Sequence, residues 1–558
     1  MGFPELEIHV NELPVIPDHI DAVAIDTEMF DMEKRRLHRE TGKFACMTIG
    51  YEKVVYIYEY ESLVPLALER VKDKIWVFYN ATFDLFHLRR WADVPERNAR
   101  NLYDVMIMDR LLWNGYYNDF SLENSVRREL SLQMDKNVRK KFEKAGQMNA
   151  ELRKYSCEDA YATYAVYQKQ QTYPHYPKAR EVWDKIEGDM IETVLNFKGF
   201  SLDVDKWTAN AEKFDKISRK IREELDFNPA SPKQVKEALA KERIFISSTA
   251  ASVLEKYPES PTAQSVLEFR GANKLASTYG MNFIYDFLEK DNKIYANYWT
   301  IGAQTGRMAS SNPNMQNIPK TATFRSCFIP AKGHKLAVAD YSQQEPRITA
   351  HLSKDSSLLD AIWRGVDLHL YVTRKIFSDE TIEKSDERRY IGKQINLGLT
   401  YGLTPWGLRR NTGLDLSECE RLVNEYFNQF SGVHNWIERQ HWFGENQNYV
   451  ETEIGRRTWL NPWSRRLYNI SVNAPVQGGA ADQTKLALVL LKQEFNARNE
   501  PYPVVAVVHD EIVLEAPENL ITCYAGLAKD AMLEAGHMLY PSVPWKADPA
   551  IGDSWAVK

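Results

Sequence analysis

Apolar runs alternate with helical stretches over roughly the first 170 residues. Strand-like runs rich in β-branched and aromatic residues occur at 22–26 (AVAID), 53–60 (KVVYIYEY) and 75–80 (IWVFYN). This alternation is typical of an α/β domain. The segment TYPHYPK at 172–178 contains two prolines, which interrupt both the helical and the strand period. It therefore predicts a connection between two domains.

The remaining chain predicts a second and larger unit. Residues 181–290 have a mostly helical period. Strand-like runs follow at 335–340 (KLAVAD) and 504–516 (VVAVVHDEIVLEA), with a long helical block between them. We therefore expect a multidomain protein of mixed α/β and α+β class without internal repeats.

Composition and charge exclude several classes of protein. The 558 residues include 71 Lys and Arg against 77 Asp and Glu, a net charge of −6, which argues against binding of nucleic acid through bulk charge. Five widely spaced cysteines without a C-x-x-C pair argue against disulfides and structural zinc. No apolar run reaches the roughly eighteen residues of a membrane helix, and the start lacks a signal-peptide pattern. We expect a cytoplasmic protein that does not contact a membrane.

Four acids and a tyrosine have compatible geometry in the first domain. Asp26 and Glu28 are two residues apart at the end of a strand, so their carboxylates project from the same face. Asp84 follows another strand, while Tyr155 and Asp159 are four residues apart and share a helical face. A lone D-x-E pair is usually only a surface feature. Together, however, the four acids offer the oxygen ligands that a pair of Mg²⁺ ions needs for phosphodiester hydrolysis.

The same residues resemble the three motifs of the DnaQ-like 3′ to 5′ exonucleases. The motifs are DTE at 26–28, NATFD at 80–84 and Y-x-x-x-D at 155–159. The resemblance implies that Tyr155 orients the attacking water. It also implies a set of metal ligands: Asp26, Glu28, Asp84 and Asp159. We interpret Asp104 as a helix N-terminal acid outside this site.

Two acids lie at strand ends in the larger unit. The stretch KLAVADYSQQEPR predicts a buried strand that ends at Asp340, then a turn, then a helix with Pro346 in its first turn. The stretch VVAVVHDEIVLEA predicts two strands joined by a tight turn of His509, Asp510 and Glu511. Acids there replace the usual Asn-Gly or Asp-Gly and indicate a function, although a charged hairpin tip is the alternative.

A helix between these strands carries two cations on one face. Arg389, Lys393 and Leu397 recur every four residues and Tyr401 follows, so all four lie within roughly a 120° sector of one helix. Such a face offers charge to a polyphosphate and a stacking surface to a base or sugar. An ordinary amphipathic helix with basic edges is the alternative.

Taken together, these stretches closely resemble the three polymerase motifs of family A, the polymerase I-like DNA polymerases. Motif A is DYSQQEPR at 340–347, motif B is R-x-x-x-K-x-x-x-L-G-x-x-Y-G at 389–402, and motif C is VVHDE at 507–511. Further stretches follow in the family's order, at 231–239, 270–279, 305–319, 473–482 and the C-terminal GDSWAVK. The resemblance therefore covers nearly the whole chain.

The resemblance implies an RNase H-like exonuclease domain at 1–178 and a right-hand polymerase domain at 179–558. Within the latter we expect a thumb at about 181–290, a palm at about 291–353 and 441–558, and fingers at about 354–440. We expect no 5′ nuclease domain, because the exonuclease motifs begin within thirty residues of Met1.

The resemblance also assigns roles in the polymerase site. Asp340 and Asp510 would hold two Mg²⁺ ions, with Glu511 as a secondary ligand or support, and Lys393 would also protonate the leaving pyrophosphate. Nucleotide binding would involve Arg389, Lys393, His369, Leu397, Tyr401 and Glu345, of which Glu345 would exclude ribonucleotides. DNA binding would involve Arg307, Asn473, Gln477 and His509.

Four residues depart from the family pattern without removing a metal ligand. They are Gln344, Pro346, Leu397 and Asn469. These departures bear on fidelity and nucleotide selection rather than on the reaction.

We therefore expect template-directed DNA synthesis with 3′ to 5′ proofreading, by a monomer that takes primer–template DNA and dNTPs. Each of the two sites would use two Mg²⁺ ions, with Mn²⁺ as an alternative. The cell would be a bacterium or a phage-infected bacterium, and accessory replication proteins are not identifiable from the sequence. Two other functions stay open: a nuclease whose second half only binds DNA, and a non-catalytic replication scaffold. Primer extension with and without dNTPs separates all three.

Overall fold

The computed structural model describes residues 2–30, 42–135 and 137–557. Its first domain is a mixed sheet with the strand order β1-β4-β3-β2-β5-β6 among the described residues. The strands are β1 (Glu7–Val10), β2 (Ala22–Phe30), β3 (Lys43–Tyr51), β4 (Val54–Tyr58), β5 (Ile75–Phe78) and β6 (Leu102–Asp104). The runs at 22–26, 53–60 and 75–80 correspond to β2, β4 and β5, whereas the sequence reading did not identify β3, which pairs with both β2 and β4.

Helices cover this sheet and bring distant residues to its edge. They are α1 (Val64–Arg70), α2 (Ala81–Trp91), α3 (Val105–Trp113), α4 (Leu122–Leu130), α5 (Arg139–Ala145) and α6 (Ala150–Gln170). The long helix α6 packs across β2 and β3. It therefore carries residues of the third exonuclease-like motif to the strand that holds the first.

The segment 172–178, which its prolines predicted as a connection between two domains, contains the break between α6 and the next helix. Helix α7 (Tyr176–Val182) begins inside it, with Pro177 in the first turn. Proline is tolerated there because the N–H groups of the first turn form no hydrogen bond within the helix. A π-helix, η2 (Trp183–Glu187), and α8 (Gly188–Leu195) continue directly from α7. This helical segment packs against α3 of the first domain and against α22 (Leu467–Ala497) of the second, so it bridges the two halves.

The second domain is built on an antiparallel sheet of order β15-β16-β12-β17. Its strands are β12 (His334–Asp340), β15 (Val504–Val508), β16 (Glu511–Pro517) and β17 (Ala550–Gly552). Helix α23 (Ile521–Leu539) packs on this sheet, and α22 packs on α23. The register places Asp340 opposite Glu511, so the two acidic strand ends meet.

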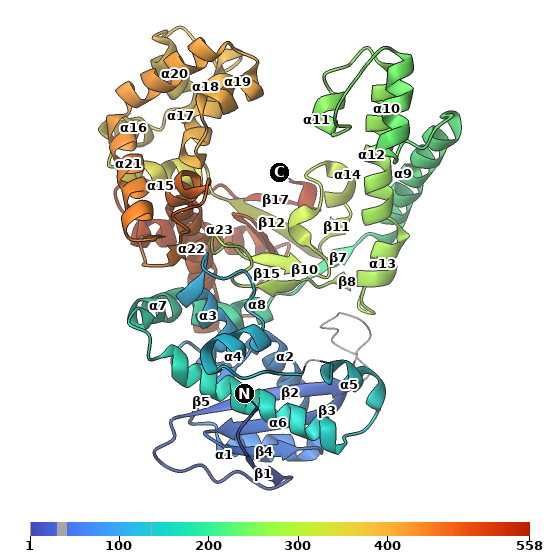
Figure 1. Cartoon of the computed structure of the whole chain (residues 1–558), viewed down its shortest axis with the longest axis vertical. Coiled ribbons are helices and arrows are strands. Elements are labelled where there is room, and N and C mark those ends of the chain that lie inside the picture. The colour runs from blue at the N-terminus through green and yellow to red at the C-terminus, as the bar shows by residue number, and fades with distance from the viewer. Residues whose placement is uncertain (1, 31–41, 136, 558) are drawn as a thin grey trace.

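Two helical arms rise on opposite sides of this sheet (Figure 1). One arm, drawn in green, contains α9 (Val204–Glu224), α10 (Pro232–Lys241), α11 (Ala251–Leu254), α12 (Pro261–Thr278) and α13 (Met281–Phe287). The other, in yellow to orange, contains α16 (Ser356–Trp363), α17 (Leu368–Phe377), α18 (Arg388–Gly398), α19 (Pro405–Thr412), α20 (Leu416–Gln429) and α21 (Ser431–Asn446). Helix α15 (Gln344–Ser353) follows β12 and packs on α21 and α22.

Short elements complete the second domain. They are β7 (Phe200–Leu202), β8 (Lys293–Ile294), β9 (Asn297–Trp299), β10 (Ala309–Ser311), η3 (Met315–Asn317), α14 (Ala322–Arg325), β11 (Phe328–Ile329), β13 (Tyr449–Glu451) and β14 (Arg457–Trp459), with η1 (Glu61–Leu63) in the first domain and η5 (Trp555–Val557) at the end of the chain. Within the described ranges, no helix combines the length and apolar character needed to cross a bilayer.

An aromatic core joins the first arm to the sheet. Trp207 of α9 is fully buried and stacks on Phe283 with ring centroids 4.3 Å apart. Phe324 of α14 and Phe328 of β11 contact the same indole, at 4.9 and 5.7 Å, and belong to the same apolar cluster as Leu336 and Val338 of β12. The position of the arm therefore depends on this cluster.

We expect Trp207→Ala to lower the free energy of unfolding by about 3–5 kcal/mol, because it removes a large buried side chain whose neighbours cannot collapse into the space. Urea unfolding followed by circular dichroism measures the change. The control is Trp442→Ala, which removes a half-exposed indole and should cost less than about 0.5 kcal/mol. Equal midpoints for the two variants would contradict the packing role of Trp207.

Candidate active sites

Three of the four acids predicted in the first domain form one cluster. Ligand oxygens of Asp26, Glu28 and Asp159 all lie within 4.8 Å of one another. Strand β2 supplies the first two and helix α6 supplies the third. The structure thus brings together residues more than 130 positions apart in sequence, in a group that could hold a metal ion.

The electrostatics of this cluster favour a bound cation. Burial, followed by the charges of Glu28, Asp84 and Asp159, raises the pKa of Asp26 well above its usual range. Burial also raises the pKa of Glu28 to about 7, although the nearby Arg139 opposes this shift. Oxygen Oδ2 of Asp26 is buried and accepts no hydrogen bond from the described residues. Hard divalent cations bind such crowded carboxylate oxygens, so the residues present fit a divalent ion.

Asp84 and Tyr155 lie next to this cluster. Oδ1 of Asp84 accepts hydrogen bonds from the backbone N–H and the hydroxyl of Thr27, at 2.9 and 2.7 Å. Burial raises the pKa of Asp84 to about 8, so ionisation of this carboxyl is unfavourable unless a cation lies nearby. Tyr155 is buried one helical turn before Asp159, and its pKa is raised by burial and by the charges of Asp159 and Glu28.

Asp104 has the structural role that the sequence indicated. It caps the N-terminus of α3 by accepting hydrogen bonds from the N–H groups of Met106 and Ile107. It also accepts a bond of 2.7 Å from the N–H of Ala81 at the start of α2. The interpretation as a helix N-terminal acid is therefore confirmed.

Two residues near this site escaped the sequence analysis. Thr27 lies between the two acids of the D-T-E motif, and its hydroxyl at that place could have suggested a contact with another acid of the site. Arg139 opposes the raised pKa of Glu28 but lies in a run of charged residues that gives no local clue.

The acids of the second domain meet at the ends of paired strands. Asp340 is the last residue of β12, and Asp510 lies in the turn between β15 and β16. Burial and the charge of Asp340 raise the pKa of Asp510 to about 6, which indicates that the two carboxylates are close. His509 has a φ of +60°, a conformation that costs a non-glycine residue about 1–3 kcal/mol and is typical of functional turns.

The turn is one residue shorter than predicted, because Glu511 is the first residue of β16 and pairs with Val508. The two carboxylate oxygens of Glu511 lie 3.3 and 3.2 Å from Nη1 of Arg325. The indole N–H of Trp555 donates a further hydrogen bond to the same carboxylate. Of the two roles considered for Glu511, these contacts favour support over metal binding.

Predicted residues from the sheet and the second arm line one cavity of about 370 Å³. Its lining includes Arg307, Glu345, Leu397, His509 and Asp510. Within it, Nη2 of Arg307 lies 2.5 Å from Oε1 of Glu345. Leu397 lines the cavity from α18, so the second arm and Asp510 contribute to the same cavity, whereas Asp340 is not part of its lining.

A basic group lies further along the second arm. Arg389 and Lys393 are on α18 and His369 is on the neighbouring α17. Arg389 is held by an ion pair of 2.8 Å with Asp367, and Nδ1 of His369 lies 3.2 Å from the amide nitrogen of Asn396. Burial, together with the charges of Lys393 and Arg389, lowers the pKa of His369. Two cations, Arg389 and Lys393, therefore lie near His369, and Asp367 balances the charge of Arg389.

The sequence predicted Tyr401 on the same helix as Arg389, Lys393 and Leu397, but α18 ends before it. The helix ends at Gly398, and Tyr401 lies in the 3₁₀ turn η4 (Leu399–Tyr401). The chain then turns at Gly402, which has a φ of +72°, and a Cβ there would lie 2.4 Å from side-chain atoms of Asn469. This close approach to α22 leaves no room for a side chain at residue 402.

The predicted residues of α22 lie outside the cavity lining, as do Asp340, Arg389, Lys393, His369 and Tyr401. Asn469, Asn473 and Gln477 follow at helical spacing along α22. Oδ1 of Asn473 is buried and accepts no hydrogen bond from the described part of the chain.

The departures from the family pattern have structural partners. The amide nitrogen of Gln344 lies 3.2 Å from the Ala480 carbonyl, 3.0 Å from Gln483 and 3.3 Å from Thr484. Pro346 is the third residue of α15, within its first turn as predicted.

Comparisons with known proteins identify the family of each domain. The family model of DNA polymerase family A matches residues 204–557, and that of the 3′-5′ exonuclease matches residues 6–172. The chain is 33% identical over 370 residues to DNA polymerase I of Lactococcus lactis, covering 62% of this chain and 42% of that protein. It thus spans less than half the length of this curated relative. DNA polymerase I of Aquifex aeolicus is 27% identical over 558 residues, covering 91% of this chain and 92% of the relative.

A solved structure shares the fold. The structure titled "POL domain of Pol1 from M. smegmatis complex with DNA primer-template and dNTP" has a TM-score of 0.83 at 22% identity, covering 97% of this chain and 96% of its own. The predicted fold class, an exonuclease domain followed by a polymerase domain, is confirmed. Since the polymerase match alone covers more than half of its residues, this chain belongs to the family A DNA polymerases and carries a 3′-5′ exonuclease domain ahead of the polymerase domain.

Proposed function

We propose that this chain synthesises DNA from dNTPs on a primed template and removes misincorporated nucleotides from the 3′ end. The cavity that joins Asp510, Glu345 and Leu397 carries this proposal, because it sets paired acids against a helix bearing Arg389 and Lys393. The exonuclease domain would extend over 1–178 and the polymerase domain over 179–558. The chain would act as a monomer in the cytoplasm of a bacterium or of a phage-infected bacterium.

In the polymerase site, Asp340 and Asp510 would hold two Mg²⁺ ions, with Mn²⁺ as an alternative. When bound, such ions lower the pKa of the primer 3′-OH and neutralise charge on the phosphates. The guanidinium of Arg389 would bind the triphosphate together with His369. Lys393 would do the same and would donate a proton from Nζ to the leaving pyrophosphate.

Three contacts around the nucleotide would decide selection. Glu345 would occupy the space beneath the 2′ position and exclude ribonucleotides. Leu397 would pack on the sugar and Tyr401 would stack at the template side. Arg307, Asn473 and Gln477 would contact minor-groove acceptors that every base pair shares, with His509 beside the primer end.

In the exonuclease site, Asp26, Glu28 and Asp159 would hold the divalent ions, with Asp84 contributing while Thr27 holds its Oδ1. The expected ions are again two Mg²⁺. The phenol of Tyr155 would orient the water that attacks the terminal phosphodiester.

Replacing both Asp26 and Glu28 by Ala should abolish 3′ degradation and leave extension intact. The acids of the exonuclease site and those of the polymerase site lie in separate domains and share no residue. Trimming of a mismatched 3′ end without dNTPs is the measurement, with Glu151→Ala, an exposed acid of α6, as the control. A double variant that trims at the parental rate would overturn the assignment.

Asp510→Ala should reduce nucleotide addition roughly a thousandfold, because it removes a metal ligand at the reacting phosphate. The Kd for primer–template DNA should change by less than about threefold, since basic side chains supply most of that affinity. Single-turnover extension and a DNA-binding titration test both statements. Asp548→Ala, an exposed acid of the same domain, is the control, and extension near the parental rate in D510A would place the metal site elsewhere.

Leu397→Tyr should make the enzyme accept dideoxynucleotides roughly ten- to a hundredfold more readily. A normal nucleotide can bond its 3′-OH to its own phosphate, and a dideoxynucleotide loses that bond. A tyrosine hydroxyl can replace it, whereas leucine cannot.

The measurement is the ratio of ddNTP to dNTP incorporation in the D26A/E28A background. Gln394→Tyr serves as the control, because Gln394 contacts Asn411 of α19 and is not part of the cavity lining. An unchanged ratio in L397Y would show that residue 397 does not face the nucleotide.

A further inference from the structure

A buried network of charged side chains joins the bridging helical segment to α22. Oε1 of Glu187, in the π-helix, lies 2.5 Å from both Arg456 Nη2 and Lys485 Nζ. Oδ1 of Asp482 lies 2.7 Å from the same guanidinium, and Oδ2 accepts a hydrogen bond of 2.7 Å from the Thr452 hydroxyl. All four charged side chains are 3% exposed or less. Since taking charges out of water costs more than apolar packing would, such a network calls for a role beyond stability.

The network contacts the loop that carries Arg307. The side chain of Arg456 lies flat against Gly306, where an added Cβ would be 2.8 Å from Arg456 Cδ. Gly306 has a φ of +78°, and the loop is closed by bonds from the N–H groups of Gly302 and Ala303 to the Arg307 carbonyl. The position of Arg456 therefore helps to set the position of the loop backbone at Gly306, and with it the Cα of Arg307.

Arg307 in turn holds Glu345. Its guanidinium lies 2.5 Å from the Glu345 carboxylate, on the wall of the polymerase cavity. Gln344, the preceding residue, is bonded to Gln483 and Thr484 of α22. Lys485, the next residue of α22, belongs to the network and also lines the cavity. Glu345 is thus held in two ways. Arg307 contacts its side chain, and the hydrogen bonds of Gln344 to α22 hold its backbone. Both sets of contacts lead to the stretch of α22 that contains Asp482.

We propose that the network of Glu187, Arg456, Asp482 and Lys485 is a positioning set for sugar selection. It holds Arg307, and through Arg307 the carboxylate of Glu345, in the place from which a 2′-OH is excluded. This inference rests on the proposed function of the cavity. A steric gate discriminates by its position, and shifts well under 1 Å are enough to open it. Loosening the network should therefore relax sugar selection before it abolishes synthesis.

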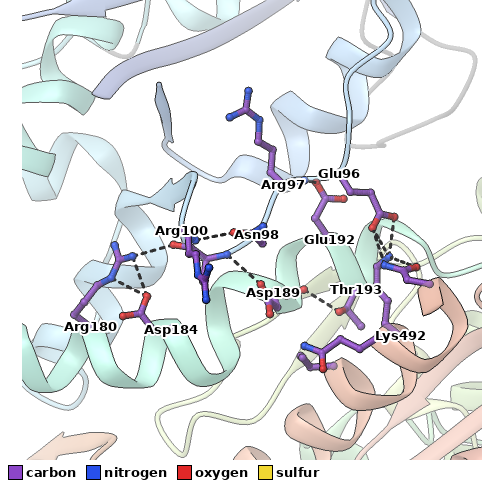
Figure 2. Close-up of a pocket in the computed structure, with 14 residues that line it drawn as sticks. Glu96, Arg97, Asn98, Arg100, Arg180, Asp184, Asp189, Glu192, Thr193 and Lys492 are labelled. Atoms are coloured by element: carbon purple, nitrogen blue, oxygen red, sulfur yellow. Dashed lines mark hydrogen bonds and ion pairs between the residues drawn. The ribbon is translucent and has the colours of Figure 1, made fainter. Parts of the chain in front are cut away.

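Glu192 provides a matched control on the same bridging segment. It is 3% exposed, and its carboxylate accepts bonds of 2.7 and 2.8 Å from Arg89 and of 3.0 Å from the N–H of Arg97. Figure 2 shows Glu192 beside a pocket of about 870 Å³, opposite Lys492 of α22. Its contacts lead to the exonuclease domain rather than to the loop of Arg307.

The test compares Glu187→Gln, Gly306→Ala and Glu192→Gln in the D26A/E28A background. Single-nucleotide insertion gives kcat/KM for an rNTP and for the matching dNTP. We expect Glu187→Gln to raise the rNTP to dNTP ratio about tenfold, within the range of coupling inside one charged network. Gly306→Ala should raise it in the same direction without removing any charge. Glu192→Gln should keep the ratio within about twofold.

Each outcome decides the matter. If Glu187→Gln does not fold, Gly306→Ala gives the answer. Parental ratios in the folded variants, with a relaxed ratio in Glu345→Ala, would overturn the inference and leave the proposed function intact. An equal rise in Glu192→Gln would attribute the effect to general loosening of the bridging segment, and would also overturn it. A parental chain that adds no nucleotide would instead refute the proposed function.

Discussion

Repulsion between crowded carboxylates is the constraint on which both sites depend. In each domain the ends of paired or packed elements bring acids together, and water reaches them only in part: Glu28, Asp84 and Asp159 are buried, whereas Asp26, Asp340 and Asp510 are partly exposed. The pKa of Asp26 is raised far above its usual range by burial and by three neighbouring acids, and that of Asp510 is raised to about 6 by burial and by Asp340. A chain tolerates such crowding only if the surrounding sheet and helices are stable enough to hold it, or if a cation relieves it. The long helices α6 and α22 and the aromatic core around Trp207 supply that stability.

The acids outside the proposed metal sites are paired in a different way. Asp104 accepts three backbone N–H groups, Glu511 faces Arg325 and Trp555, and Glu187 faces two cations. Each of these acids is contacted by protein donors, and each fixes the relative position of two elements. Oxygen Oε2 of Glu187, like Oδ2 of Asp26, is buried and accepts no hydrogen bond from the described residues, so an unbonded oxygen alone does not mark a ligand site. The nearest charges separate the two kinds of acid, because Glu187 and Glu511 face cations whereas the acids of the first-domain cluster face one another.

The sequence predicted what depends on neighbouring residues and missed what depends on distant ones. Asp340 at a strand end and the Tyr155–Asp159 face follow from short-range periodicity. The helical pattern does break near 172–178, as predicted, but Pro177 also starts the next helix there. Tyr401 was placed on the wrong element because α18 ends at Gly398 and a 3₁₀ turn follows it. The pairing of Glu511 with Arg325, 186 residues away, has no local signature at all.

Two departures from the family pattern, Gln344 and Leu397, line the same cavity. Gln344 is buried, and a buried amide is tolerated only when it is hydrogen-bonded, which ties it to three oxygens of α22. Hydrogen bonds are directional where apolar packing is not, so α15 is fixed in register on α22, and Glu345 with it. Leu397 differs, because its side chain lines the cavity without a hydrogen-bonding group. In the proposed site, sugar recognition therefore depends on the fixed shape around Glu345, and little of it can come from hydrogen bonds at residue 397.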